Sequence, residues 1–145
     1  NQVWLADISY IATDEGWLYL AVILDLFSRR IIGWAMDARM TQGLVEKALR
    51  MALMRRGLDA VPQLHHSDRG SQYCSLEYRK LLGQFGMQAS MSRRGNCYDN
   101  APIESFWGML KNELVHHRRY ATRWKAMQEI TEYIEIFYNR QRRQK

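Results

Sequence analysis

The chain has 145 residues, 47% of them hydrophobic, and a formal net charge of +6 at pH 7. This length and composition fit one compact domain, residues 1–145, that can bury a core. The longest apolar run, Trp17 to Leu24, is too short to cross a bilayer, and two cysteines do not make a disulfide framework. Composition therefore excludes a membrane-spanning protein and a disulfide-stapled secreted one, and we expect a cytoplasmic protein.

The positive charge is concentrated in short basic runs. They are Arg29-Arg30, Arg55-Arg56, Arg93-Arg94, Arg118-Arg119 and Arg140 to Lys145. Such runs favour a polyanionic partner, although arginines that only cover a solvated surface give the same pattern. Because the chain starts at Asn1 and stops within the last basic run, we interpret it as a fragment of something longer.

Three strands are expected at the start of the chain. The alternation from Val3 to Ile11, the apolar run from Trp17 to Asp25 and the segment from Arg30 to Met36 predict an antiparallel meander. Asp7 is out of place in the first strand, because aspartate is depleted in strands and a buried carboxylate requires a partner, a proton or a metal ion. We interpret Asp25 as a turn residue that bonds nearby backbone amides.

The middle of the chain alternates helices and strands. The pattern predicts a helix from Thr41 to Gly57, a strand from Val61 to Asp68, a helix capped by Ser75 that ends at Gly86, and a strand from Met87 to Met91. Asp68 ends its strand just before a glycine-containing loop. That is where open α/β sheets place their ligands.

The stretch around Glu104 predicts a helix with a polar face. The helix begins after Asn100 and carries apolar residues at helical spacing, namely Ile103, Phe106, Trp107, Leu110 and Leu114. Glu104 and Lys111 share one face, with Gly108 between them. Glycine costs about 1 kcal/mol relative to alanine inside a helix, which suggests that something approaches the backbone closely on that face.

A last helix is expected from Thr122. Its apolar stripe consists of Ala126, Met127, Ile130, Tyr133, Ile134 and Phe137. The elements together predict an α/β architecture, a mixed five-stranded sheet of a three-strand antiparallel meander plus two parallel strands, flanked by helices. This order of elements resembles the ribonuclease H-like fold.

Three acids stand in unusual places: Asp7 within a strand, Asp68 at a strand end and Glu104 on a helix. If the first and fourth strands are neighbours, Asp7 and Asp68 come close together, and the helix can bring Glu104 over them. Clustered carboxylates raise one another's pKa unless cations neutralise them, and oxygen-only ligands suit Mg²⁺ or Mn²⁺. Two such ions about 4 Å apart would clamp an in-line displacement at phosphorus. The pattern predicts metal-assisted phosphoryl transfer on a polynucleotide.

Longer motifs carry a resemblance to a known family. They are WLADISY (4–10), DLFSRRIIGW (25–34), HSDRGSQY (66–73), GNCYDNAPIESF (95–106) and Tyr138-Asn139. Residues 69 to 103, which number 35, separate Asp68 from Glu104, and Lys111 follows that glutamate by seven positions. With these motifs and this spacing, the chain resembles the catalytic core of bacterial insertion-sequence transposases of the IS-three family, relatives of retroviral integrases.

The resemblance implies a role for each matching residue. It makes Asp7, Asp68 and Glu104 the metal-binding catalytic triad and lets Lys111 contact substrate DNA near the reacting phosphate. It also implies a homodimer or higher oligomer on DNA, with transposon ends and target DNA as partners and no membrane. Two features depart from the family: Gln144 stands where a histidine is usual, and the N-terminal DNA-recognition region is absent.

Other residues have weaker patterns. We expect Arg93 and Arg94, in the loop before the glutamate helix, to contact phosphates. His66, beside Asp68, is a candidate for contact with DNA or metal, with a structural role as the alternative. Zinc binding by Cys74 and Cys97 lacks the usual ligand spacing. Two tryptophans, 107 and 124, stand at core spacing, and we interpret them as packing residues.

The sequence thus predicts a Mg²⁺-dependent (or Mn²⁺-dependent) DNA nicking and strand-transfer core. Water would attack a phosphodiester at a transposon end, and the released 3′-hydroxyl would attack another. Two rivals remain open. One is a ribonuclease H-like or Holliday-junction nuclease that acts on another substrate. The other is a catalytically silent module that only dimerises and holds DNA.

Overall fold

The computed structural model describes residues 3–56, 64–67, 73, 75–91 and 101–140. The strands are β1 (Val3–Thr13), β2 (Gly16–Asp25), β3 (Ile31–Asp37), β4 (Leu64–Ser67) and β5 (Gln88–Met91). The helices are α1 (Gln42–Arg56), α3 (Leu76–Gln84), α4 (Ala101–Glu113) and α5 (Arg123–Glu132), with a 3-10 turn η2 (Val115–His117) and a π-helical segment η3 (Tyr133–Tyr138). Among these described helices, none is both long enough and apolar enough to pass through a membrane.

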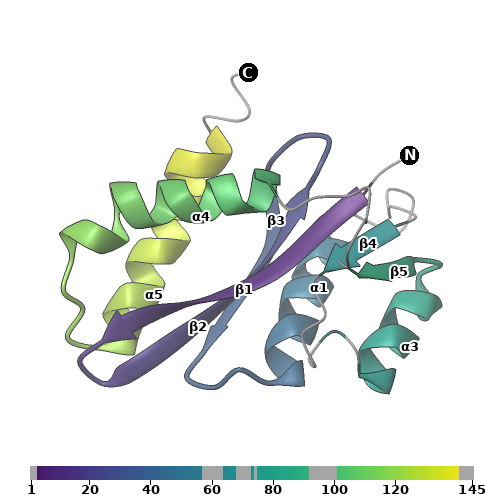
Figure 1. The fold of residues 1–145 in the computed structure, drawn as a ribbon, viewed down its shortest axis with the longest axis horizontal. Helices are drawn as coiled ribbons and strands as arrows, with labels where there is room; N and C mark the ends of the chain where they lie inside the picture. The colour runs from purple at the N-terminus through teal and green to yellow at the C-terminus, as the bar shows by residue number, and fades with distance from the viewer. Residues whose placement is uncertain (1–2, 57–63, 68–72, 74, 92–100, 141–145) are drawn as a thin grey trace.

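The five strands form one mixed sheet in the order β3-β2-β1-β4-β5 (Figure 1). β1, β2 and β3 pair antiparallel, and β4 and β5 continue the sheet in parallel from β1. The predicted meander plus two parallel strands is therefore confirmed. β1 is the strand on which both halves meet, because it pairs with β2 along one edge and with β4 along the other.

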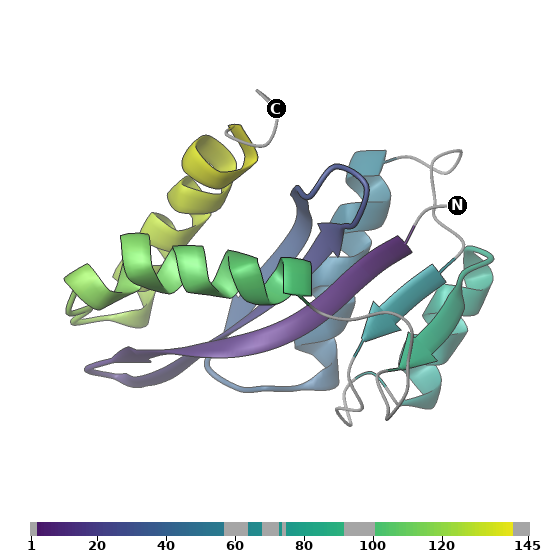
Figure 2. The same ribbon diagram turned by 45° about the horizontal axis from the view of Figure 1, so that its top comes forward.

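Helices cover both faces of the sheet, and the strand alternation decides which side chains meet which helices (Figure 2). On one face Val3, Leu5 and the alternate residues of β2 pack against α4, α5 and η3. On the other face Trp4 and Ala6 pack against α1 and α3. β2 is buried on both sides, as its near-continuous apolar sequence predicts.

Side-chain caps start two of the helices where the sequence places them. The Ser75 hydroxyl accepts the backbone N–H of Tyr78, and the Thr122 hydroxyl accepts that of Lys125. Each cap satisfies a backbone donor that has no partner within its own helix.

The predicted buried stripe of the last helix is confirmed as far as Ile134 and is wrong at Phe137. Phe137 is 55% exposed, and the next residue, Tyr138, is buried instead. The segment Tyr133–Tyr138 is a π-helix, which takes more residues per turn than an α-helix and so moves the buried face one position along the chain. The packing role assigned to Trp124 is also wrong, because that side chain is 66% exposed on α5.

The motif Tyr138-Asn139 joins the end of the chain to the meander. The Tyr138 hydroxyl donates to the carbonyl of Arg29 at 2.8 Å. The Asn139 side chain accepts from the backbone N–H of Ile31 and donates to its carbonyl, both at 2.9 Å. Asp25 holds the same turn, since its Oδ2 accepts from the backbone N–H and the hydroxyl of Ser28. The predicted role of Asp25 in the turn is confirmed.

Gly33 lets β3 lie directly on α1. A Cβ at this position would overlap the carbonyl oxygen of Ala48 and would lie 2.9 Å from the Ala52 Cβ. We expect Gly33→Ala to lower the free energy of unfolding by about 1–3 kcal/mol, the usual scale for overpacking a core. Urea denaturation measures this. The control is Gly43→Ala, whose Cβ would lie 3.7 Å from the Thr41 hydroxyl and should change stability by less than about 0.5 kcal/mol. Equal stability of the two variants would contradict this account of the packing.

His65 anchors β4 to α3 from the inside. Its Nε2 lies 2.7 Å from the Tyr78 hydroxyl, and both side chains are buried. Burial lowers the pKa of His65 from 6.5 to about 4, so the imidazole is neutral in the folded chain at pH 7.

The anchoring histidine should make stability depend on pH. Between pH 6.5 and about 4 the unfolded chain binds the proton and the folded chain does not, so stability falls as pH is lowered through this window. The full loss is about 3 kcal/mol at 1.36 kcal/mol per pKa unit. We expect His65→Gln to flatten this slope in urea titrations at a series of pH values, while His117→Gln, on the exposed turn η2, keeps the wild-type slope. A wild-type slope in His65→Gln would contradict the assignment.

Candidate active site

Asp7 is the first of the three predicted acids, and it lies on the α4 side of β1. Its side chain is half-buried, on the same face as the buried Leu5. The Trp107 indole N–H donates to Asp7 Oδ2 at 3.0 Å. This bond ties the strand to the helix across 100 residues of sequence.

The position of Asp7 in the sheet is defined by where β4 stops pairing. The parallel register runs from Val3 opposite Leu64 to Ala6 opposite Ser67. Asp7 is the next residue of β1, and Asp68 is the next residue of the sequence after β4. The two strands are neighbours, as the prediction requires, while Asp68 itself lies outside the described residues.

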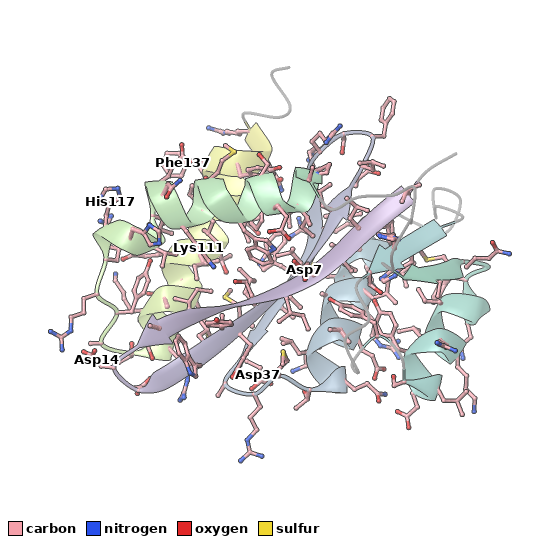
Figure 3. All side chains as sticks on the ribbon, viewed as in Figure 1. Asp7, Asp14, Asp37, Lys111, His117 and Phe137 are labelled. Carbon is pink, nitrogen blue, oxygen red and sulfur yellow. The ribbon has the colours of Figure 1, made fainter. Side chains whose placement is uncertain are left out.

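α4 carries the remaining two predicted residues, and it lies beside β1 (Figure 3). Glu104 is exposed in its first turn, and Lys111 is half-buried in its last. Trp107 stands between them, three positions after Glu104 and four before Lys111, so it neighbours both along the helix. The donor to Asp7 is therefore the helical neighbour of both predicted residues.

Gly108 leaves the face between Glu104 and Lys111 open. A Cβ on Gly108 would meet no other part of the described chain within 4 Å, and the residue is exposed. The close approach that its helical position suggests is not made by this protein's own described residues. Any group that approaches that backbone closely comes from another molecule or from the rest of the chain.

The described residues contain no group of three histidine, cysteine or acidic side chains that could hold a metal ion. They include only Asp7 and Glu104 of the three expected ligands, because Asp68 falls outside them. Both side chains offer carboxylate oxygens, which are the donors that Mg²⁺ and Mn²⁺ prefer.

His66 lies in the interior rather than at a surface. Its exposed fraction is 0%, and burial lowers its pKa, so it is held as a neutral side chain. The register places His65 with Trp4 and His66 with Leu5, on opposite faces of the sheet, as expected. An imidazole with no exposed surface favours the structural alternative, and the contact of His66 with DNA or metal stays a prediction.

The other weak candidates divide into two groups. Arg93, Arg94, Cys74 and Cys97 lie outside the described residues.

Several members of the basic runs are paired with acids: Arg55 with Glu135 at 3.5 Å, Arg118 with Glu129 at 3.0 Å and Arg119 with Asp14 at 3.3 Å. These pairs reduce the positive charge that the runs can offer to a polyanion.

Trp107 is the functional candidate that sequence reasoning treated as packing alone. It does pack, with 5% of its side chain exposed and its ring centroid 5.1 Å from that of Phe106. Its N–H, however, bonds a predicted catalytic acid. The sequence did contain a signal for this contact. Trp107 stands one helical turn after Glu104, and if Ile103 is buried, the side of the helix that carries Trp107 must face β1.

Comparison with known proteins decides the family. Two sequence profiles, each described as an integrase core domain, match residues 1–97 and 104–145. The chain belongs to the integrase core domain family. The predicted family relationship is thereby confirmed, and the matched regions include β1, β4 and the part of α4 from Glu104 onward.

Related proteins come from insertion sequences. The chain is 59% identical over 143 residues to the insertion element IS600 uncharacterized 31 kDa protein of Shigella sonnei, covering 99% of this chain and 52% of that protein. It is 49% identical over 143 residues to transposase InsF for insertion sequence IS3A of Escherichia coli (strain K12), covering 99% of this chain and 49% of that protein. The chain thus spans about half the length of the curated relatives it matches.

Solved structures with the same fold are retroviral. The HTLV-2 integrase catalytic core domain in complex with magnesium has a TM-score of 0.69 at 15% identity, covering 93% of this chain and 86% of that one. The catalytic core domain of BIV integrase has a TM-score of 0.69 at 14% identity, covering 93% and 84%. At this identity the likeness concerns the fold, which is the expected ribonuclease H-like one.

Proposed function

We propose that this chain is the catalytic core of an insertion-sequence transposase, which uses Mg²⁺ or Mn²⁺ to hydrolyse DNA at transposon ends and to transfer the resulting strands. The observation that carries the proposal is the bond from Trp107 to Asp7. It joins the strand that carries Asp7 to the helix that carries Glu104 and Lys111, in a chain 49% identical to transposase InsF.

The donor set fits a hard divalent cation. We infer that Asp7, Asp68 and Glu104 would together hold the Mg²⁺ or Mn²⁺, as two ions. Carboxylate oxygens are the ligands that Mg²⁺ and Mn²⁺ prefer in proteins, and all three residues would offer them. Bound there, the cations would neutralise the acids and stabilise charge on the attacking and leaving oxygens.

The chain's own part in the reaction is placement. In the first reaction the oxygen of water forms a bond to phosphorus while the bond to the 3′ oxygen breaks, which leaves a 3′-hydroxyl. In the second, the oxygen of that hydroxyl forms a bond to the phosphorus of another phosphodiester while the bond from that phosphorus to its 3′ oxygen breaks, which joins the two strands and leaves a new 3′-hydroxyl. β1 positions one acid, α4 positions another, and the hydrogen bond from Trp107 to Asp7 joins the two elements, so orientation supplies much of the rate.

We propose that the face of α4 that carries Glu104 also contacts DNA. Lys111 lies on the helix face that carries Glu104, and we propose that it contacts the DNA backbone near the reacting phosphate. Arg93 and Arg94 precede α4 in the sequence, and we propose that they contact phosphates as well. We further infer that the protein works in the bacterial cytoplasm as a dimer or higher oligomer on DNA. One HTLV-2 integrase core structure is described as dimeric and another as trimeric.

Removing an acid should abolish chemistry and leave the fold intact. We expect Asp7→Asn and Glu104→Gln to reduce nicking and strand transfer on a pre-nicked branched DNA with Mn²⁺ by roughly a hundredfold or more, the scale of losing one preorganised charge-stabilising group. DNA binding should remain. The matched control is Glu132→Gln, an exposed acid of α5, which should keep wild-type rates.

The rivals give different results in the same assay. Full metal-dependent nicking by Glu104→Gln would contradict the triad. Preference for an RNA–DNA hybrid over DNA would favour the ribonuclease H-like nuclease. DNA binding that ignores metal, with no cleavage by the wild-type chain, would favour the silent binding module.

Gly108 provides a test in which stability and binding change in opposite directions. We expect Gly108→Ala to stabilise the free chain by about 0.5–1 kcal/mol, because alanine suits a helix interior and the added methyl meets no described atom. If DNA approaches the backbone between Glu104 and Lys111, the same methyl should weaken DNA binding. Thermal denaturation and a fluorescence-anisotropy titration with duplex DNA measure the two effects.

The control for Gly108 is Gly83→Ala in α3. Its added methyl would also meet nothing within 4 Å, so it should leave DNA affinity unchanged. Unchanged DNA affinity in Gly108→Ala would show that the glycine face is not where DNA approaches.

A further inference from the structure

The geometry points to Trp107 as a positioning residue. We propose that its neutral indole N–H holds the Asp7 carboxylate in the orientation in which it binds a divalent cation. The inference rests on the proposed metal-binding role of Asp7. It assigns to Trp107 a function beyond packing.

The bond has ordinary geometry and joins two well-fixed elements. The Nε1–Oδ2 distance is 3.0 Å, within the usual range for N–H···O. Trp107 is 5% exposed and packs beside Phe106, so the indole cannot swing away without opening the core. Asp7 stands on β1, which is paired on both edges up to its neighbour Ala6. The Asp7 carboxylate therefore accepts from a donor that the core holds in place.

Burial alone does not explain the bond. Trp4 is also fully buried, and among the described residues its indole N–H has no hydrogen-bond partner. The fold therefore tolerates a buried tryptophan whose N–H is unsatisfied. That the Trp107 N–H meets a carboxylate is a property of this place in the fold, one helical turn from Glu104.

A neutral donor has an advantage that a charged one lacks. A lysine or arginine that oriented Asp7 would neutralise the carboxylate and compete with a cation for it. An indole N–H is a donor only and carries no net charge, so it does not itself neutralise the carboxylate that it orients. Groups that orient metal ligands in this way typically change metal affinity or activity by about 10–100-fold when they are removed.

The substitution that tests this is Trp107→Phe, which keeps an aromatic ring beside Phe106 and removes the N–H. We expect the Mn²⁺ concentration for half-saturation to rise by about tenfold. Electron paramagnetic resonance measures the concentration of free Mn²⁺ in the absence of DNA, and so gives the half-saturation concentration independently of activity. Strand transfer at saturating Mn²⁺ should fall much less than at low Mn²⁺. A residue that only packs would lower the melting temperature and leave the Mn²⁺ midpoint unchanged.

Two controls make the result specific. Trp124→Phe makes the same change at an exposed site on α5 and should leave the midpoint unchanged. Asp7→Asn tests the proposed function itself and should abolish the high-affinity Mn²⁺ binding. Loss in Asp7→Asn with no shift in Trp107→Phe would overturn the positioning role alone. Wild-type Mn²⁺ binding in Asp7→Asn, or none in the wild type, would overturn the metal site and the positioning role with it.

The hydrogen bond can also be observed without metal. The five tryptophans give five indole N–H resonances in a ¹⁵N–¹H spectrum, and the one lost in Trp107→Phe is that of Trp107. We expect this resonance to move upfield in Asp7→Asn, where the acceptor loses its charge, while that of Trp124 stays in place. A Trp107 resonance that does not respond to Asp7→Asn would overturn the proposal.

Discussion

The constraint on which the site depends is the unequal length of two neighbouring strands. β1 has eleven residues, whereas β4 has four and pairs with β1 only from Val3 to Ala6. Asp7 is the first residue of β1 past that pairing. At this point the antiparallel half of the sheet continues and the parallel half ends, and the carboxyl end of a parallel strand is where open α/β sheets bind ligands. α4 lies beside β1 and is joined to it there by the hydrogen bond from Trp107 to Asp7.

Much of this arrangement could be predicted from residues because it depends on local patterns. Strand alternation put Leu5 and Asp7 on one face and Trp4 on the other, and Ser75 and Thr122 marked two helix starts through their own hydroxyls. That β1 and β4 are neighbours could only be assumed from the sequence, because pairing between distant segments leaves no local signal. The register now confirms that assumption.

What the sequence could not supply is tertiary. At η3 the buried face of the helix shifts by one residue, which exposes Phe137 and buries Tyr138. This shift depends on how the last helix packs against the sheet and not on the spacing of its apolar residues. His66 is polar and stands two residues before an acid, which favours a site residue, yet its side chain is completely buried on a strand that is paired on both edges. The bond from Trp107 to Asp7 joins segments 100 residues apart, and no periodicity reports it.

The positions that break local rules are grouped in one part of the molecule. An aspartate within a strand and a glycine within a helix each oppose the preference of their own element. Asp7 and Gly108 would be unrelated defects if they lay apart, but Asp7 is bonded to Trp107, the residue immediately before Gly108. Local rules are expected to fail together where function demands it. The paired arginines show the opposite case, because Arg118 and Arg119 break no rule and are matched by acids at the surface. The two rule-breaking residues, more than the net charge, are therefore the reason why we propose the chemistry where β1 and α4 meet.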